Sequence, residues 1–377
     1  MSDRVPRVAI VHHWLVTMRG GEKFLESLCN IFPDAHIYTH VCRKENLSPT
    51  LQAREISTSF INALPFSNRL YKYYLPLMPM ATEAFDLQNY DLVISSDACT
   101  VKGVITNFSA LHICYCHSPM RYIWGMDYLY IGNRNWFIRR LFSFVSHYLR
   151  LWDLASASRV DEFATNSQAV ANRISKCYRR VATPLGGPVD CDLFHASSER
   201  EDFYLFVGQL VGYKRADLAV QACSRLRRKL VVIGQGETSN YLRQFEGNDI
   251  VFLGSAPFKT LVEHYSRCRA LLFPGEEDFG LVPIEAMASG APVIAYRAGG
   301  ALDTIEDGVS GLFFDDPTVE SLMEAIQRFE SNKSFDVTRI TACARKHHIR
   351  SFEARFRDFV DRCLVKRGKP PLKIGNP

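Results

Sequence analysis

The stretch Phe273-Pro-Gly-Glu-Glu-Asp-Phe-Gly-Leu-Val-Pro-Ile-Glu-Ala-Met-Ala-Ser-Gly290 indicates the fold of this chain. It follows the apolar run 270–273 and leads through a glycine-containing turn into a helical pattern. A buried strand that passes through a turn into a helix is the repeating unit of a parallel sheet covered by helices. The stretch therefore predicts an α/β fold, and it places two acids, Glu277 and Glu285, around the start of one helix.

The same alternation extends outward in both directions. In the second half, strands are expected at residues 203–207, 229–233, 249–253, 270–273 and 292–296. In the first half, strands are expected at 7–11, 35–39, 91–95, 112–116 and 162–165, with helices near 21–31, 136–157 and 167–178. The pattern predicts two Rossmann-like domains whose ligands bind in a cleft at the carboxyl ends of the strands.

A chain of 377 residues is longer than one hydrophobic core usually supports, which agrees with two domains. The segment from Thr183 to His195 is rich in proline and glycine and has no periodicity, so it predicts a linker. We therefore expect a first domain at residues 1–187 and a second at 188–349, with a helix at about 350–366 packing back on the first. The basic tail after Lys366 is expected to be frayed.

The composition, 47% hydrophobic and 23% charged residues, excludes a disordered or fibrous protein. The eleven scattered cysteines indicate reduced core thiols and a cytoplasmic location. The sequence contains no run of about 18 apolar residues and no signal-peptide pattern, so no segment is expected to span a membrane. Residues 1–187 hold 20 Lys and Arg against 14 Asp and Glu, and the remainder holds 25 against 26, so the first half is the basic one.

Candidate site residues follow the expected strands. Phe279, Gly280 and Leu281 open a helix, so their backbone amides are placed to face a phosphate or a sugar, with Glu277 before that helix and Glu285 about one turn into it. Acids near a helix start are also common for dipole reasons alone, but this does not account for the glycine-containing turns.

Two further turns carry glycine or basic residues. Gly20 and Gly21 precede a helix, where a diphosphate would meet free amides, although a tight turn explains them equally well. Lys214 and Arg215 are expected to open a helix, and a lysine there opposes the helix dipole unless an anion lies nearby. A solvated Lys-Arg pair remains the alternative.

His117 follows the strand 112–116, so its imidazole is expected at a strand end, ready to bind a hydroxyl or an oxyanion. A loop histidine without a ligand is the alternative. Cys114, Cys116 and His117 resemble part of a metal site, but neighbouring strand residues point to opposite faces and no second ligand cluster accompanies them. The sequence Gly234-Gln-Gly-Glu237 lacks the third glycine of a dinucleotide fingerprint and is interpreted as a strand-to-helix turn.

Two segments combine aromatic and basic residues, a composition typical of surfaces that meet lipid headgroups. These are residues 71–80 and the helical run 136–152, which contains Arg139, Arg140 and Arg150. For the helical run, a buried core helix with a basic outer edge is the favoured interpretation, and docking of the basic first domain on a membrane is the alternative.

Together these motifs resemble the retaining glycosyltransferases of family 4, also called group 1, which have the GT-B fold, and the resemblance covers almost the whole chain. The Glu-x7-Glu element of that family corresponds to Glu277 and Glu285. Its continuation corresponds to Gly290-Ala-Pro-Val-Ile-Ala-Tyr-Arg-Ala-Gly-Gly300, and Asp307-Gly-Val-Ser-Gly-Leu-Phe313 completes the pattern.

The resemblance implies roles for these residues. Gly20, Gly21 and Lys214 would contact the donor phosphates, with the amides near Phe279, Gly280 and Leu281. His117 would bind the 6-hydroxyl of the donor sugar, Glu277 its 3- and 4-hydroxyls, and Glu285 the ribose. The catalytic residues would then be His117, Lys214 and Glu277. Gln209 stands where the family usually has an arginine, so phosphate neutralisation would depend on Lys214, with Arg215 as a second candidate.

Blocks such as Cys116-His-Ser-Pro-Met-Arg-Tyr122 also resemble bacterial mannosyltransferases that use GDP-mannose to build lipid-linked O-antigen or exopolysaccharide. This implies a polyprenyl-diphosphate-linked or other glycan acceptor, with Arg121 and Tyr122 on the acceptor side, and an anionic membrane surface as a partner. It also implies that no metal and no cofactor is needed. The alternatives are a sugar-nucleotide epimerase of the same fold and an inactive scaffold, the latter suggested only by Gln209.

Overall fold

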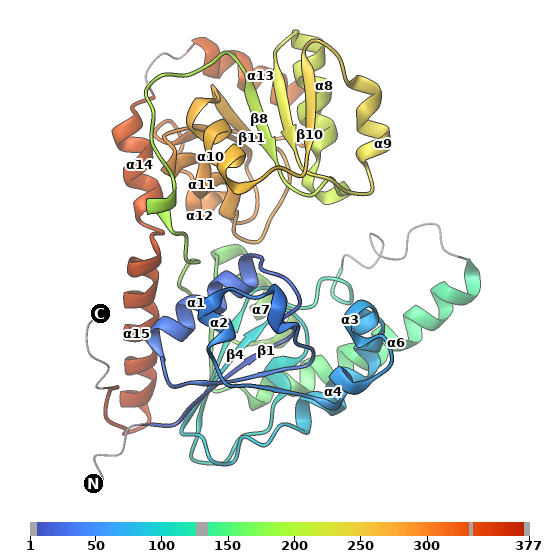
Figure 1. Cartoon of the computed structure of the whole chain (residues 1–377), viewed down its shortest axis with the longest axis vertical. Helices are drawn as coiled ribbons and strands as arrows, with labels where there is room; N and C mark the ends of the chain where they lie inside the picture. The colour runs from blue at the N-terminus through green and yellow to red at the C-terminus, as the bar shows by residue number, and fades with distance from the viewer. Residues whose placement is uncertain (1–5, 126–134, 332–334, 373–377) are drawn as a thin grey trace. The chain divides into compact units, whose positions relative to one another are not determined.

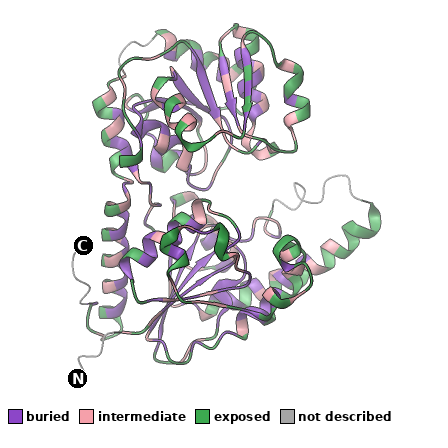
Figure 2. Ribbon diagram, viewed as in Figure 1, coloured by how far each residue is buried: buried purple, intermediate pink, exposed green. Residues whose placement is uncertain are grey.

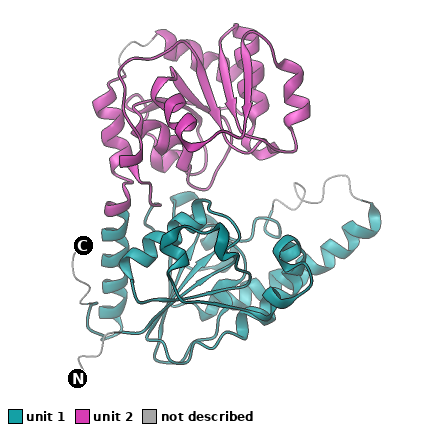
Figure 3. Cartoon of the chain, in the orientation of Figure 1, with its two compact units in different colours: residues 1–186, 352–377 teal, residues 187–351 magenta. Residues whose placement is uncertain are grey.

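The computed structural model describes residues 6–125, 135–331 and 335–372. Its internal contacts divide the chain into two compact units, shown in Figure 3. Unit 1 comprises Met1–Gly186 and Phe352–Pro377, and unit 2 comprises Gly187–Ser351. The chain thus leaves unit 1 near residue 187 and returns to it within its last long helix.

Unit 1 is built on a seven-stranded parallel sheet, whose centre is labelled β1 and β4 in Figure 1. In spatial order its strands are β3 (Ile56–Thr58), β2 (His36–Thr39), β1 (Val8–His12), β4 (Leu92–Asp97), β5 (Leu111–Cys116), β6 (Glu162–Thr165) and β7 (Ala182–Pro184). Its helices are α1 (Gly20–Ile31), α2 (Pro49–Gln52), α3 (Ser67–Leu70), α4 (Met78–Glu83), α6 (Trp136–Ser156), α7 (Gln168–Tyr178) and most of α15 (Ile349–Lys366).

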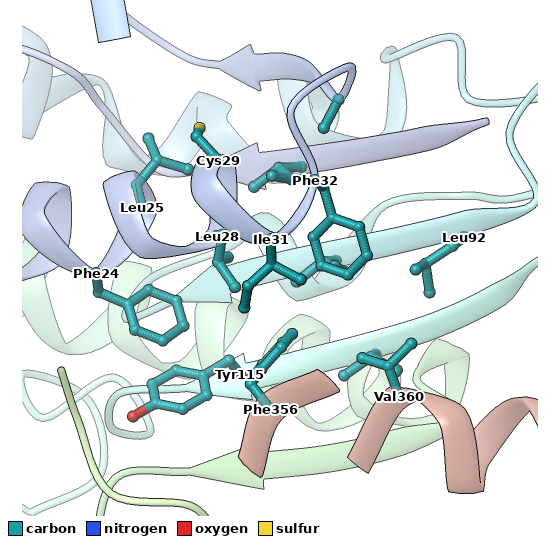
Figure 4. Packing of buried hydrophobic residues seen from close by; sticks show 14 of the residues in the cluster. Phe24, Leu25, Leu28, Cys29, Ile31, Phe32, Leu92, Tyr115, Phe356 and Val360 are labelled. Atoms are coloured by element: carbon teal, nitrogen blue, oxygen red, sulfur yellow. The ribbon is translucent and has the colours of Figure 1, made fainter. Parts of the chain in front are cut away.

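Helix α15 completes the core of unit 1 by packing beside α1 (Figure 4). The ring of Phe24 on α1 stacks on Tyr115 of β5 at a centroid distance of 4.0 Å, and Phe356 of α15 packs edge-on to Phe24. Both phenylalanines are buried, so replacing Phe356 with alanine would cost about 3–5 kcal/mol. The C-terminal helix is therefore an integral part of unit 1.

Unit 2 is built on a six-stranded parallel sheet with strand order β10-β9-β8-β11-β12-β13. Its strands are β8 (Tyr204–Val207), β9 (Leu230–Ile233), β10 (Ile250–Gly254), β11 (Ala270–Phe273), β12 (Val293–Tyr296) and β13 (Gly311–Phe314). Its helices are α8 (Ala216–Leu226), α9 (Ser239–Leu242), α10 (Phe258–Arg267), α11 (Leu281–Ala288), α12 (Ala301–Thr304), α13 (Val319–Ser331) and α14 (Val337–Arg345).

Alternate residues of the central strands in unit 2 enter opposite cores. Leu271 of β11 packs with α10, α11 and α14 on one face, while Leu272 packs with α8 and α13 on the other. Such strands are apolar on both faces, which is why they read as continuous hydrophobic runs in the sequence. The two parallel, helix-covered sheets confirm the predicted α/β class with two Rossmann-like domains.

The ten strands expected from the sequence are all present, within two residues at each end. The sequence missed β3, β7 and β13, and each of these is an edge strand of its sheet. Edge strands are short and lack the two-sided burial that produces a strong apolar signal. The expectation of a frayed tail is wrong for residues 367–372, because Leu372 is buried in the core of unit 1 and its amide donates to Asp361, while residues 373–377 lie outside the described residues.

Helix α6 is not the buried core helix that the sequence favoured. Only Ser146, Leu149, Asp153 and Ser156 are buried, whereas Phe137 and Phe144 are 68% and 74% exposed. Figure 2 shows this helix largely in the colour of exposed residues. An apolar residue pattern alone does not tell which face of a helix meets protein, and here a second apolar face lies outside the core.

All eleven cysteines are free thiols in the structure, and most are buried and contribute to packing. For the part of the chain that the structure describes, no helix combines the length and the hydrophobicity that crossing a membrane requires.

Candidate functional site

Each sheet has one point where its strand order reverses, and the candidate residues lie next to these two points. In unit 1 the reversal lies between β1 and β4, and in unit 2 between β8 and β11. Connections leave in opposite directions at such a point, which opens a crevice at the carboxyl ends of the strands. The sites of the two units are described separately.

In unit 2 the structure brings Lys214 and Glu277 together. The Lys214 ammonium Nζ lies 2.7 Å from Glu277 Oε1, and both side chains are largely buried. The sequence left open whether Lys214 was a solvated surface lysine. The answer is that it has a carboxylate partner, contributed by the loop that follows the neighbouring strand.

A close backbone approach positions this pair. The loop after β11 passes so near the loop after β8 that a Cβ atom at Gly275 would lie 2.6 Å from the Cα of Lys214. Only glycine fits there, because the obstructing atoms are backbone and cannot move aside cheaply. The glycine of the Phe273-Pro-Gly sequence thus sets the distance between Lys214 and the segment that carries Glu277.

Gly280 is the N-cap of α11 and has a φ of +89°, a conformation that favours glycine. It turns the chain sharply, so that the first amides of α11, including that of Leu281, have no partner within the helix. Phe279 is buried in the core of unit 2 and contributes its ring to packing. A helix start of this kind is suited to an anion, and the binding of one by these amides stays a prediction.

Glu285 lies on the second turn of α11, where the hydroxyl of Tyr265 donates to its Oε2 at 3.0 Å. Tyr265 belongs to α10 and is fully buried. Burial, followed by the nearby Glu285 carboxylate, raises the pKa of Tyr265 well above its usual range, so the phenol remains a donor. Sequence analysis missed Tyr265, because the apolar pattern of α10 does not show which of its side chains contacts a residue of α11.

The remaining basic candidate of unit 2 differs from expectation. Lys214 ends a short 3-10 turn (Gly212–Lys214), and Arg215 is the N-cap of α8, so Arg215 opens the helix and Lys214 lies just before it. The Arg215 guanidinium donates to both carboxylate oxygens of Asp217 and is not brought together with the Lys214–Glu277 pair. Gln209 is exposed next to the end of β8.

In unit 1 Gly20 and Gly21 begin α1, a helix of twelve residues. The Arg19 amide donates to the Glu22 carboxylate, which closes the N-terminal turn from one side. The amides of Gly20 and Gly21 have no partner within the helix, as in any first helical turn. Tight-turn and anion-binding interpretations therefore both remain compatible with this geometry.

His117 lies one residue past β5 and joins a hydrogen-bonded chain. Its Nε2 lies 2.9 Å from Ser96 Oγ, and the same oxygen lies 3.0 Å from His12 Nδ1. His12 and Ser96 are paired residues of β1 and β4, at the strand reversal. Burial, then the neighbouring His13, lowers the pKa of His117 to about 3, so its imidazole is neutral at physiological pH.

Sequence analysis missed His12, His13 and Ser96, which all line this edge of the sheet. The pKa of His12 lies well below its usual range because of burial and then the neighbouring His13. Burial also lowers the pKa of His13 to about 4, partly offset by a hydrogen bond to the Ser96 backbone. The signal that was available is the His-His pair directly after an apolar strand run.

The two acceptor-side candidates are both partly buried. Tyr122 packs into two hydrophobic clusters of unit 1, and its hydroxyl lies 3.1 Å from Cys99 Sγ. Arg121 adjoins it in the same turn. Their assignment to an acceptor stays a prediction.

Cys114 and Cys116 are buried in a hydrophobic cluster of unit 1, and His117 is engaged with Ser96, so these three residues are not arranged around one point. Asp190, Asp192 and His348 are the only three described residues whose ligand atoms lie close enough to hold an ion, within 4.8 Å of one another. Two of them are exposed acids, and His348 already pairs with Asp192 at 3.2 Å. Such groups are common without an ion, so we place no metal there.

Comparison with known proteins follows the same division. Residues 194–347, which lie within unit 2, match the family described as glycosyl transferases group 1. This is the segment that holds Lys214, Glu277 and Glu285. Unit 2 is thus similar to that family over most of its length.

Curated relatives agree with this assignment. The chain is similar to a GDP-mannose-dependent alpha-mannosyltransferase of Corynebacterium glutamicum, with 36% identity over 29% of this chain and 27% of that protein. It is also similar to the alpha-1,3/1,6-mannosyltransferase alg2 of Schizosaccharomyces pombe, with 24% identity over 65% of this chain and 56% of that protein. Four of these relatives are matched over only 27% to 56% of their own length.

Solved structures extend the likeness to both units. The structure of Anabaena HepE in complex with UDP matches with a TM-score of 0.71 at 16% identity, over 94% of this chain and 99% of that one. The fold of the whole chain is therefore GT-B.

Proposed function

We propose that the protein is a retaining glycosyltransferase that moves a hexose, mannose from GDP-mannose, onto a lipid-linked glycan in bacterial surface polysaccharide synthesis. The observation that carries the proposal is the Lys214–Glu277 pair beside the start of α11. The family match of unit 2 and the mannosyltransferase relatives support it.

In this proposal unit 2 binds the donor. Negative charge grows on the diphosphate as the bond to the sugar breaks, and groups fixed in advance around that charge lower the barrier. The amides at the start of α11 and the Lys214 ammonium are such groups. Glu277, held by the lysine, meets the sugar hydroxyls, and Glu285, held by Tyr265, meets the ribose.

Unit 1 provides His117 and the acceptor side. A neutral imidazole both donates and accepts a hydrogen bond, which suits a sugar hydroxyl better than it suits a charged phosphate. The acceptor hydroxyl attacks on the face that the diphosphate leaves, and the departing phosphate takes its proton. Because helix amides and a lysine stabilise the diphosphate, we propose that no metal ion is required.

The exposed face of α6 supports a membrane surface as partner. Besides Phe137 and Phe144, it exposes Leu141, Tyr148 and Leu151, spaced so that they follow one side of the helix. The basic residues of α6 are Arg139, Arg140 and Arg150, and its one acid, Asp153, is buried. An apolar stripe flanked by cationic groups matches the interface of an anionic membrane, where a lipid-linked acceptor would lie.

The test is transfer activity of Lys214→Ala and Glu277→Ala with GDP-mannose and a membrane extract as acceptor, in the presence of EDTA. Each change should reduce kcat/KM by at least tenfold, about 1.4 kcal/mol. Lys259→Ala and Glu263→Ala, exposed on α10, are the matched controls and should retain activity.

Unchanged activity in both site variants would show that the site is wrongly assigned. A donor panel that includes UDP-sugars decides the sugar and the base. Isomerisation of the donor without any acceptor would instead identify an epimerase, and absence of donor binding would favour an inactive scaffold.

A further inference from the structure

The carboxyl edge of the unit 1 sheet holds a buried histidine nitrogen that no other group in the structure satisfies. The side chain of His12 is fully buried, its Nδ1 is engaged with Ser96, and its Nε2 has no hydrogen-bond partner among the residues that the structure describes. Leaving such an atom unpaired in a protein interior costs about 1–3 kcal/mol. A group of this kind at a strand reversal points to a ligand.

The surroundings of this nitrogen indicate the chemistry of such a ligand. A Cβ atom at Gly21 would lie 3.5 Å from His12 Cε1 and 3.8 Å from His12 Nε2, so this edge of the ring faces the start of α1. The amides there are donors, and the helix dipole favours negative charge. An oxygen that accepts from the Gly20 and Gly21 amides would therefore lie within reach of His12 Nε2.

Three side chains then act in a line. Ser96 Oγ has one proton and lies between His12 Nδ1 and His117 Nε2, so it donates to one ring and accepts from the other. Both imidazoles are neutral, so each carries one N–H. If the Ser96 hydroxyl donates to His12, it must accept from His117, and the reverse also holds. The tautomer of one histidine therefore fixes the tautomer of the other.

We propose that His12 binds a phosphate oxygen of the donor diphosphate and that Ser96 transmits this contact to His117, which fixes the His117 tautomer. This inference rests on the proposed function and adds to it a diphosphate contact and a positioning residue. In the bound state His12 Nε2–H donates to the phosphate oxygen. Ser96 Oγ–H then donates to His12 Nδ1, and His117 Nε2–H donates to Ser96 Oγ.

The consequence is a defined acceptor for the sugar. With its proton on Nε2, His117 presents the lone pair of Nδ1, which accepts a hydrogen bond from a sugar hydroxyl. A diphosphate at α1 thus prepares His117 for a hydroxyl donor, and a ligand without the diphosphate does not. No proton leaves the line, since each group donates one hydrogen bond and accepts another.

Two variants of His12 separate ligand binding from structure. Asparagine reproduces the Nδ1 position and keeps the bond to Ser96 but removes the Nε2 contact, whereas glutamine reaches the Nε2 position and loses Ser96. Calorimetry with GDP and with UDP should show affinity reduced about tenfold or more in His12→Asn and within about threefold of wild type in His12→Gln. A purely structural His12 would give equal affinities in both variants, which overturns the proposal.

Tautomers are read directly in the wild-type protein. In protein with ¹⁵N-labelled histidine, adding GDP should place the His117 proton on Nε2, and Ser96→Ala should abolish this response while GDP still binds. A His117 signal that ignores GDP in wild type overturns the relay but leaves the proposed function intact. If wild type binds neither GDP nor UDP, the proposed function fails, and this inference fails with it.

Discussion

The buried hydroxyl of Tyr265 orients Glu285, one of the two candidate acids of unit 2. Tyr265 donates to Glu285 from a neighbouring helix, and neither residue can be exchanged without affecting the other. The Lys214–Glu277 pair has the same character, because each side chain is held by its partner. The role of each of these four residues therefore depends on its partner in the pair.

At this scale we predict that Tyr265→Phe lowers the affinity for GDP by about three- to tenfold, because Glu285 loses its orienting hydrogen bond. Stability should fall by about 1 kcal/mol. The measurement is calorimetric titration with GDP and with 2′,3′-dideoxy-GDP, which lacks the hydroxyls assigned to Glu285. Only GDP affinity should change.

Tyr204→Phe is the matched control. Tyr204 is also buried and donates to an acid, Glu330, at 2.9 Å, but it does so on the opposite face of the sheet. Equal losses for GDP and the dideoxy analogue in Tyr265→Phe would contradict the ribose assignment of Glu285.

At the scale of elements, helix α6 is held on one side by a buried ion pair and is exposed to solvent on the other. Lys102, fully buried, pairs with Asp153 of α6 and with Asp97 at the end of β4. Trp124 and Tyr178 donate to the same Asp153 carboxylate. The acid is thus buried together with its cation and its donors, which is the condition for keeping a charge in a core. This anchor holds α6 so that its second apolar face remains outside.

We predict that Phe137→Ser and Phe144→Ser each weaken binding to anionic vesicles by about tenfold. Each change removes an apolar side chain whose transfer from water into an apolar environment is favourable by about 1.5–3 kcal/mol. Flotation with vesicles containing phosphatidylglycerol at low salt measures this. Thermal stability should change by less than about 0.5 kcal/mol, since both side chains are exposed.

Tyr241→Ser, at an exposed aromatic residue of unit 2, is the control and should float like wild type. Wild-type protein that fails to float with anionic vesicles at low salt would remove the membrane from the proposal.

At the scale of the whole molecule, the two units differ in their buried histidines. Six histidines whose pKa is lowered, with burial as the first cause, all belong to unit 1: His12, His13, His36, His40, His112 and His117. Burial lowers the pKa of His112 to about 4 and that of His40 to about 3. In unfolded chains these groups titrate near 6.5.

Acid should therefore destabilise unit 1. Between pH 6.5 and about 4 the unfolded chain binds more protons than the folded one, so the free energy of unfolding decreases as the pH falls. Each such histidine contributes up to about 1.4 kcal/mol per pH unit in this window. Calorimetric scans at pH 7, 6 and 5 should show that the transition of unit 1 moves to lower temperature with acid.

His112→Gln offers a check, because it removes one of these histidines at a position on β5 that is away from the residues proposed to bind ligands. It should lower stability at pH 7 and make the dependence on pH shallower. A melting temperature that is constant from pH 7 to 5 would contradict the assignment of neutral buried histidines.

The sequence by itself determined the elements that local pattern controls. Apolar runs predicted the central strands, glycine turns predicted the starts of α1 and α11, and Glu277, Lys214 and His117 were placed at strand ends. These features depend on neighbours within a few residues, so a linear reading reaches them. Edge strands such as β7, which contains Pro184, escaped because their burial is one-sided and brief.

Only the tertiary structure decided which side chains meet. His12 faces Ser96 because β1 and β4 pair in one register, although 84 residues separate them. Lys214 meets Glu277 because two loops touch at Gly275, and Tyr265 meets Glu285 because two helices cover the same face. Which face of α6 remained outside was settled in the same way. Contacts between distant segments depend on register and packing, and no local pattern encodes them.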